Sequence, residues 1–272
     1  AFSMSIRADY HIHSCISPDG RHSIEEIAEK AIACGLNEIA ITDHFEFFDP
    51  ESNIHQSWSK EYLDHYFEQL QFFQERFQGR LIIRKGIEIG QPFIHQVYAD
   101  EIMKQYHFDY VIGSVHKIND CDLGRVNYLE ISIDELIREN LSSLMTLSQY
   151  SDFDCIGHLD LIKRYAAQKG VYISLLDYQE EVEVILKNLI SREKGLEINT
   201  SGLRQTVKQI LPSIEIIKRF CQLGGKVLTV GSDAHRKDDV AKDFQVAQML
   251  LEEIGVSYIA TFENRKPHFY KI

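Results

Sequence analysis

Seven short apolar segments alternate with longer amphipathic segments along the chain. The apolar segments cover residues 5–13, 37–44, 81–90, 109–116, 154–160, 195–202 and 226–235. Among the amphipathic segments, residues 23–35 open with the capping-box pair Ser23 and Glu26, as expected at the start of a helix. Strands that alternate with helices form parallel βαβ units. The sequence therefore predicts an α/β fold with seven parallel strands, arranged either as an open sheet or as a closed barrel.

Nearly every predicted strand ends in a side chain that can bind a metal ion. These residues are His11, His13, His44, Glu88, His116, His158, Asn199, Asp233 and His235. In parallel α/β folds the carboxyl ends of the strands carry the active site. A closed barrel would gather these side chains at one mouth, whereas an open sheet would spread them along an edge too long for one cluster. The pattern therefore favours a seven-stranded barrel.

His11 and His13 lie one residue apart in the segment DYHIHS. Positions two apart in a strand point to the same face, so we expect both imidazoles to project together, alongside Asp9. Paired imidazoles suit a borderline transition metal. Taken alone, the pair fits ordinary core or surface histidines better, and it is the recurrence of such residues at strand ends that favours metal binding.

The 272-residue chain carries a formal net charge of -12, which argues against a broad surface for nucleic acid. Its five cysteines are widely spaced and form no Cys-x-x-Cys pair, so we expect neither a disulfide scaffold nor a zinc–thiolate cluster, and we expect a cytoplasmic location. No apolar run is long enough to span a membrane. We expect a single domain over residues 4–272 and treat residues 1–3, before Met4, as a remnant of cloning.

The segments DYHIHS, ITDHFE, GIEIG, GSVH, IGHLD and GSDAH resemble, in this order, the motifs of the PHP (polymerase and histidinol phosphatase) domain family. They extend from Asp9 to His235, nearly the whole chain. The segments SPDG and EINTSGLR are similar to the histidinol-phosphatase branch of that family. The resemblance implies a distorted (β/α)7 barrel of the TIM-like type that holds three divalent metal ions.

The resemblance also implies which side chains hold each ion. The first ion would be bound by His11, His13 and Asp233, the second by His116 and His158, and the third by Asp19, His44 and His235. Glu88 would bridge the first and second ions. Some branches of the family have a histidine where Asp19 stands, and an aspartate is a harder ligand that favours iron or manganese over zinc.

The chemistry of these residue types agrees with that assignment. Imidazole and carboxylate ligands without thiolate suit Zn, Fe or Mn. Divalent ions about 3.5–4 Å apart can clamp the attacking and leaving oxygens of a phosphoryl transfer, and a bridging water then supplies hydroxide near neutral pH. Glu88 is therefore also a catalytic candidate. Asp160, two residues after His158, is expected either to orient a ligand imidazole or protonate the leaving alkoxide, or to cap the helix that follows.

Further side chains just beyond the strand ends are candidates for binding the substrate. Arg164 and Arg204 could each bind phosphate oxygens in a bidentate way, and we favour Arg204 because of the EINTSGLR motif. The other candidates are Asn199 and Ser201, which would shape the pocket, Glu46, which would receive an imidazole or amine, and Lys117, a weaker phosphate candidate.

The metal cluster predicts a phosphomonoester hydrolase, and the resemblance implies its substrate. The expected reaction converts L-histidinol phosphate to L-histidinol and phosphate, a step of histidine biosynthesis. One alternative is a PHP phosphoesterase that acts on nucleotides or single-stranded DNA ends, which would need a basic groove or stacking aromatic side chains. Others are a metal-binding regulatory protein without catalysis and an amidohydrolase-like barrel. The sequence leaves the native metal and the oligomeric state open.

Overall fold

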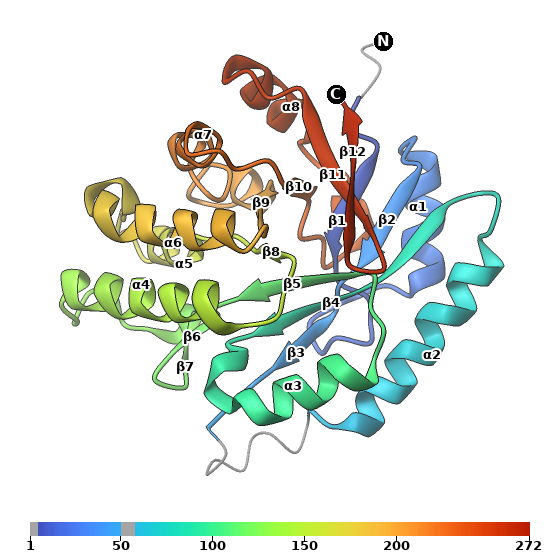
Figure 1. Cartoon of the computed structure of the whole chain (residues 1–272), viewed down its shortest axis with the longest axis horizontal. Helices are drawn as coiled ribbons and strands as arrows, with labels where there is room; N and C mark the ends of the chain where they lie inside the picture. Colours follow the sequence, from blue (N-terminus) through green and yellow to red (C-terminus); the bar gives the residue numbers. More distant parts are fainter. Residues whose placement is uncertain (1–4, 50–57) are drawn as a thin grey trace.

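Seven parallel strands form a nearly closed barrel in the computed structural model, which describes residues 5–49 and 58–272 (Figure 1). In spatial order the strands are β1 (Ala8–Ile12), β2 (Glu38–Ile41), β4 (Ile82–Gly90), β5 (Tyr110–Ser114), β8 (Cys155–Ile156), β9 (Gly195–Asn199) and β10 (Leu228–Gly231). The ring closes where Ile12 forms a parallel bridge with Ala234, and the His13 N–H donates to the Ala234 carbonyl at 2.8 Å. The distorted seven-stranded barrel is therefore confirmed, while the expected domain start at Met4 lies outside the described residues.

Helices surround this barrel. They are α1 (Ile24–Ala33), α2 (Lys60–Arg76), α3 (Gln96–Gln105), α4 (Ile133–Tyr150), α5 (Leu161–Gln168), α6 (Gln179–Ser191), α7 (Ile214–Gln222) and α8 (Phe244–Glu253). The predicted capping box between Ser23 and Glu26 is present at the start of α1. The sequence did not indicate α3, whereas α5 is the helix that one of the two expectations for Asp160 placed directly after that residue. Within the described ranges no helix is long and apolar enough to cross a membrane.

Two antiparallel hairpins and one short strand were not predicted. The strand β3 (His44–Glu46) follows β2 and pairs with β4. The hairpin of β6 (Lys117–Ile118) and β7 (Cys121–Asp122) follows β5 at the carboxyl end of the barrel. The hairpin of β11 (Tyr258–Glu263) and β12 (Lys266–Lys271) covers the opposite end, where the Asn264 N–H donates to Asp109, the residue before β5, at 3.0 Å. One mouth of the barrel is thus closed and the other is left for a functional site.

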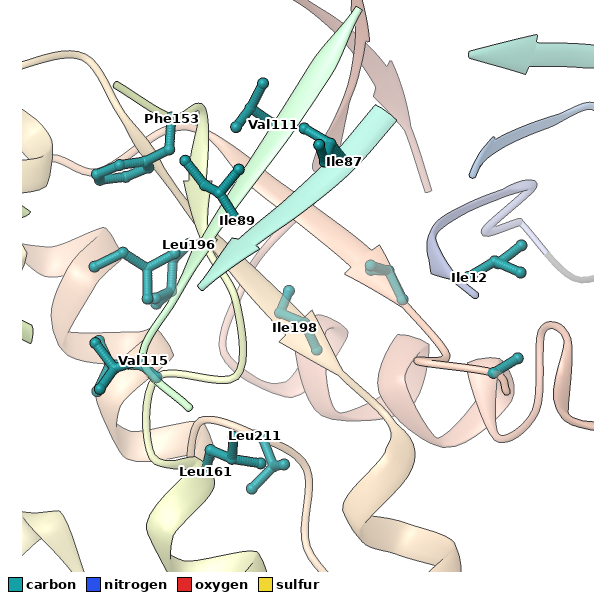
Figure 2. Packing of buried hydrophobic residues seen from close by; sticks show 14 of the residues in the cluster. Ile12, Ile87, Ile89, Val111, Val115, Phe153, Leu161, Leu196, Ile198 and Leu211 are labelled. Atoms are coloured by element: carbon teal, nitrogen blue, oxygen red, sulfur yellow. The ribbon is translucent and has the colours of Figure 1, made fainter. Parts of the chain in front are cut away.

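Alternation along the strands separates an apolar layer from a polar interior. Ile87 and Ile89 of β4 pack in the main hydrophobic core together with Val111 and Phe153 (Figure 2). Because alternate residues of a strand point to opposite faces, Glu88 between these isoleucines points into the barrel. The burial of the isoleucine side chains, each worth about 1.5–3 kcal/mol, holds β4 in the register that directs Glu88 inward.

The hydroxyl of Tyr66 ties α2 to the middle of β4 and to the segment that follows β2. The side chain is fully buried, its O–H donates to the Gly86 carbonyl at 2.7 Å, and its oxygen accepts the Asp43 N–H at 3.1 Å. Asp43 lies between β2 and β3, and Gly86 lies opposite this gap on β4. The hydroxyl therefore completes hydrogen bonding that the sheet itself does not supply.

We expect Tyr66→Phe to lower the free energy of unfolding of the metal-free protein by about 1–3 kcal/mol, because two buried backbone groups lose this partner. Urea denaturation in the presence of a chelator measures the change. Tyr150→Phe is the matched control, since Tyr150 is 69% exposed, and it should change the free energy by less than about 0.5 kcal/mol. Equal effects of the two substitutions would show that the Tyr66 hydroxyl contributes nothing.

Candidate metal centre

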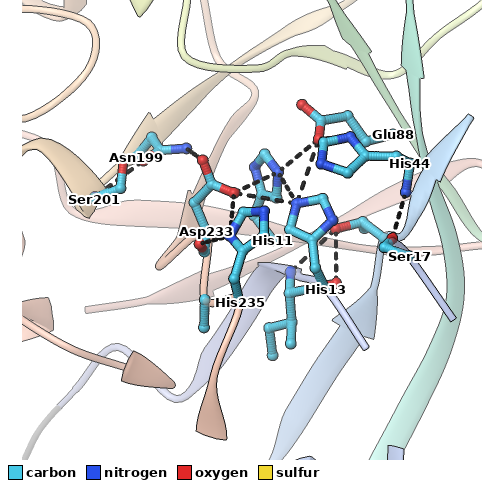
Figure 3. Close-up of polar contacts among 12 residues, drawn as sticks. His11, His13, Ser17, His44, Glu88, Asn199, Ser201, Asp233 and His235 are labelled. Carbon is cyan, nitrogen blue, oxygen red and sulfur yellow. Dashed lines mark hydrogen bonds and ion pairs between the residues drawn. The ribbon is translucent and has the colours of Figure 1, made fainter. Parts of the chain in front are cut away.

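The side chains that the resemblance assigned to metal binding meet at the carboxyl ends of the strands. Figure 3 shows six of them, which are His11, His13, His44, Glu88, Asp233 and His235. They form one cluster at the floor of a cavity of about 450 Å³. His11 and His13 are fully buried beneath it, while His44, His116 and His235 are partly exposed to it. The barrel therefore brings together residues that lie more than two hundred positions apart in the chain.

The first group of donor atoms consists of the Nε2 atoms of His11 and His13, Oε1 of Glu88 and Oδ1 of Asp233. The two imidazole nitrogens are 3.1 Å apart. His11 Nε2 lies 3.2 Å from the Glu88 oxygen and 3.3 Å from the Asp233 oxygen, and the corresponding distances from His13 Nε2 are 3.4 and 3.1 Å. Donors that bind zinc tetrahedrally at about 2.0–2.1 Å lie about 3.3–3.4 Å from one another. The spacing is that of a metal-binding cage.

The second group uses the other oxygen of the Glu88 carboxylate. Oε2 of Glu88 lies 3.1 Å from His116 Nε2 and 3.0 Å from His158 Nε2, and it accepts a hydrogen bond from the Ser114 hydroxyl at 2.7 Å. Glu88 therefore faces one set of imidazoles with each oxygen. This is the geometry that a carboxylate shared between two cations requires.

The third group lies nearer to the solvent. Oδ2 of Asp19 is 3.3 Å from His44 Nε2 and 3.1 Å from His235 Nε2. The rings of His44 and His235 both stack on the ring of His13, with centroids 4.1 and 4.2 Å away. His44 also reaches the centre of the cluster, because its Nδ1 lies 3.2 Å from Glu88 Oε1. The expected partners are thus neighbours, and the three groups form one continuous cluster.

A buried carboxylate oxygen of the cluster lacks a hydrogen-bond donor in the described part of the chain, and a bound cation would take the place of that donor. Glu88 is fully buried, yet its Oε1 accepts no hydrogen bond from any described residue. Imidazole nitrogens of His11, His13 and His44 surround this oxygen at 3.2–3.4 Å. A buried anionic oxygen without a donor is costly, whereas a divalent ion would satisfy it together with the imidazole lone pairs. The residues present therefore fit divalent metal ions.

The electrostatics of the cluster favour positive charge. Burial alone would raise the pKa of Glu88, but His11 and the other imidazoles hold that pKa well below its ordinary value. Burial would lower the pKa of His44, but its contacts with Asp19 and Glu46 raise that pKa to about 10. Neighbouring carboxylates likewise raise the pKa values of His11 and His116, so in the absence of metal the protons on His11, His44 and His116 supply the positive charge that the carboxylates require. Metal binding must displace those protons.

Two residues of the cluster have backbone angles that L-amino acids rarely adopt. His158 has a φ of 24° and Asp233 a φ of 56°. Each follows the last residue of a strand by two positions, at the point where the chain turns away from the barrel wall. Strained backbone of this kind persists only where surrounding contacts impose it, and it concentrates at functional sites.

Asp160 does not reach this cluster, which corrects the expectation that it shares a face with His158. Its Oδ2 lies 2.7 Å from Lys163 Nζ and accepts the Ser213 N–H at 3.0 Å. The expectation assumed an extended segment, but β8 ends at Ile156 and the chain turns at His158. Asp160 occupies the N-cap position of α5, although its side chain does not cap the helix.

The other predicted pocket residues are engaged with the cluster. Glu46 accepts hydrogen bonds from His116 Nδ1 at 2.5 Å and from Gln91 Nε2 at 2.6 Å, so it holds an imidazole of the cluster, although it also lines the cavity. Asn199 Nδ2 lies 3.3 Å from Asp233 Oδ2, within hydrogen-bonding distance. Ser201, in the same turn, accepts a hydrogen bond from Arg164 at 2.8 Å.

Cationic side chains line the cavity, but Arg204 is not among them. Arg164 and Lys117 both line it, and Arg164 Nη1 lies 3.3 Å from Asp233 Oδ2. Arg204 instead donates to the backbone carbonyl of Asp233 at 3.2 Å. Arg125, which the sequence did not single out, lies in the turn after the β6–β7 hairpin and lines the cavity as well.

Sequence reasoning also missed Glu197. This residue lies two positions before Asn199 on β9, so both point to the same face, and Glu197 contacts His11 and His158. The period-two pattern in "GLEIN" was the available signal. Glu197 was missed because only polar residues at the ends of the predicted strands were considered as candidates, and this residue lies in the middle of its strand.

Comparison with known proteins agrees with this geometry. The sequence model of the PHP domain matches residues 9–201. A histidinol-phosphatase of Lactococcus lactis is 30% identical over 263 residues, which cover 96% of each protein, and a probable histidinol-phosphatase of Clostridium acetobutylicum is 28% identical over 94% of this chain and 97% of that protein.

Solved structures show the same relationship. The crystal structure of the histidinol phosphate phosphatase from Lactococcus lactis, complexed with zinc, L-histidinol and phosphate, superimposes with a TM-score of 0.84 and 29% identity, covering 97% of this chain and 99% of that one. The PHP match spans well over half of the chain, and the relatives align along nearly their whole length. The chain therefore belongs to the PHP domain family.

Proposed function

We propose that this protein is a metal-dependent phosphatase that hydrolyses L-histidinol phosphate to L-histidinol and phosphate, a step of histidine biosynthesis. The observation that carries the proposal is the set of three neighbouring donor groups, joined by Glu88, at the floor of a cavity that cationic side chains line. The named relatives, and the zinc, histidinol and phosphate in the Lactococcus structure, support the choice of substrate.

The cluster supplies the reaction chemistry and the cavity wall supplies recognition. Divalent ions at these groups would neutralise the phosphate oxygens and lower the pKa of a water molecule. We assign the phosphate to Arg164, with Lys117 and Arg125 in support, because these are the cations that face the cavity. Trp58 and Tyr165 also line it and provide aromatic surfaces for the imidazole of histidinol.

The remaining features of the proposal concern the ions and the setting. We propose three divalent ions (Zn, Fe or Mn), as the three donor groups support, with His11, His13 and Asp233 around the first, His116 and His158 around the second, and Asp19, His44 and His235 around the third. We place the enzyme in the cytoplasm, in keeping with five cysteines that are all unpaired. The partner is a small phosphomonoester and not nucleic acid, in keeping with the net charge of -12.

A substrate panel on metal-quantified protein tests the reaction. We expect kcat/KM for L-histidinol phosphate to exceed that for nucleoside monophosphates and for a 5′-phosphorylated oligonucleotide by at least about tenfold, because the cavity suits a compact phosphomonoester. Removal of metal with a chelator should abolish turnover, and Zn²⁺ or Mn²⁺ should restore it. A preference for nucleotides would favour the alternative PHP phosphoesterase, and full activity after complete metal removal would refute the metal-dependent mechanism.

We expect Glu88→Ala to lower kcat by at least about a hundredfold, which corresponds to about 2.7 kcal/mol, because it removes the carboxylate that two donor groups share. Elemental analysis should show less bound metal per chain. Glu180→Ala on the exposed surface of α6 is the control and should leave both quantities unchanged. Wild-type turnover with full metal content in Glu88→Ala would show that Glu88 is not the bridging ligand.

We expect Arg164→Ala to lower kcat/KM for histidinol phosphate by at least about tenfold, the loss for a charge-assisted hydrogen bond of roughly 1.5–3 kcal/mol. Arg164→Lys keeps the charge but not the planar pair of donors, so it should recover only part of the loss. Arg138→Ala on the exposed face of α4 is the matched control.

The same assay decides between the two candidate arginines. Arg204→Ala should cost less than Arg164→Ala, because Arg204 faces a backbone carbonyl and does not line the cavity. Metal content must be measured for each variant, since both arginines contact Asp233. The reverse order at equal metal content would assign the phosphate to Arg204, as the sequence motif indicated.

A further inference from the structure

Glu197 is a fully buried carboxylate in the interior of the barrel that none of the assigned roles uses. It lies in the middle of β9, between Leu196 and Ile198, whose side chains belong to the main hydrophobic core. Because neighbouring residues of a strand point to opposite faces, the two apolar residues hold Glu197 toward the barrel axis. It does not line the cavity, so it is out of reach of a substrate.

Both oxygens of this carboxylate contact the metal-binding cluster. Oε2 lies within hydrogen-bonding distance of Nδ1 of His11. Oε1 accepts the backbone N–H of His158 at 2.9 Å and Nδ2 of Asn199 at 2.9 Å. His11 belongs to the first donor group and His158 to the second. One carboxylate therefore joins the two groups from below, on the side opposite the cavity.

The strand beside Glu197 is built to admit this contact. A Cβ atom at Gly231 of β10 would lie 2.3 Å from the Cβ of His11 and 2.9 Å from Oε2 of Glu197. Any side chain at this position would push the imidazole and the carboxylate apart. Glycine in the "VGSDAH" motif is thus required for the contact between the side chains of His11 on β1 and Glu197 on β9, because β10 lies between these two strands.

We propose that Glu197 is a positioning residue that sets the tautomer of His11 and fixes the backbone of His158. In this way it prepares both donor groups around Glu88 to bind metal ions. This inference rests on the metal-binding part of the proposed function. When Nδ1–H of His11 donates to Glu197, the lone pair of Nε2 is free to face Glu88 and Asp233. The hydrogen bond to the His158 N–H supports the residue in its left-handed conformation, with φ of 24°.

The chemistry of a glutamine at this position makes the proposal testable. In Glu197→Gln the single amide oxygen can still accept a hydrogen bond from the His158 N–H. The amide NH₂ group must then face His11 Nδ1. A donor there requires Nδ1 to be the acceptor, which moves the imidazole proton to Nε2, the atom that faces Glu88. The substitution keeps the size of the side chain and disables the donor atom of the first group.

Zinc affinity, measured by competition with a fluorescent chelator on the full chain, is the readout. We expect Glu197→Gln to weaken binding of Zn²⁺ by 10- to 100-fold, the usual effect of losing a hydrogen-bond partner of a metal ligand. Glu197→Asp should bind zinc with intermediate affinity, because it keeps an acceptor for His11. The matched control is Glu38→Gln, since Glu38 is a buried carboxylate on β2 that contacts Tyr10 and Arg84. Its zinc affinity should stay within twofold of the wild type.

Two further measurements separate positioning from folding. Thermal unfolding of the zinc-free variants should show that Glu197→Gln is folded at the assay temperature, and nitrogen NMR of histidine-labelled protein should show one imidazole that changes its protonated nitrogen. Zinc affinity of Glu197→Gln within twofold of the wild type would overturn the inference alone. A wild-type protein that binds no zinc would overturn the proposed function and the inference with it. If Glu197→Gln does not fold, the comparison passes to Glu197→Asp, for which unchanged zinc affinity overturns the inference and weakened affinity supports it.

Discussion

The carboxylate of Glu88 is the interaction on which the site depends. It is fully buried, and its two oxygens face separate sets of imidazoles at 3.0–3.4 Å. A carboxylate in that position cannot be stable without compensating positive charge, whether from protons on the imidazoles or from divalent ions. The barrel fold, the strained residues at the strand ends and the surrounding hydrogen bonds all serve to hold these groups at ligand distances from one another.

The two ends of the barrel have different functions. At the amino end, Tyr10, Tyr110 and Phe262 form an apolar plug, and the C-terminal hairpin covers it. At the carboxyl end, Glu46 and Glu197 each accept a hydrogen bond from an imidazole of the cluster. These partners orient the rings and select which nitrogen is free, as is common around metal ligands. The closed end supplies stability, and the open end accommodates the incompletely paired groups that bind ions.

Sequence reasoning anticipated the barrel and the residues of the cluster because both rest on local regularities. Period-two strands and polar strand ends are visible without a structure, and they were confirmed for β4 and β5. In β1 the expected alternation was wrong for Asp9, because the register shifts between Asp9 and Ile12 and the carboxylate accepts hydrogen bonds from Ser232 instead of joining His11 and His13. Asp160 shows where such reasoning fails: its predicted direction assumed extended backbone, whereas the chain turns at His158. Arg204 shows a second limit, because a motif names a residue type and not the atom that a guanidinium will contact. The two hairpins were not predicted because their strands are short or exposed and show no clear alternation of apolar and polar residues.

The sequence by itself determined the fold class, the family and the set of side chains available for metal binding, because hydrophobic periodicity and residue spacing are properties of the chain alone. The tertiary structure decided which atoms face one another. The register shift between Asp9 and Ile12 allows Tyr10 to pack on Tyr110 while His11 joins the cluster, and it turns Asp9 toward Ser232. Closure between β10 and β1 places Asp233 beside His13. Such contacts depend on the packing of distant strands, which no local pattern encodes.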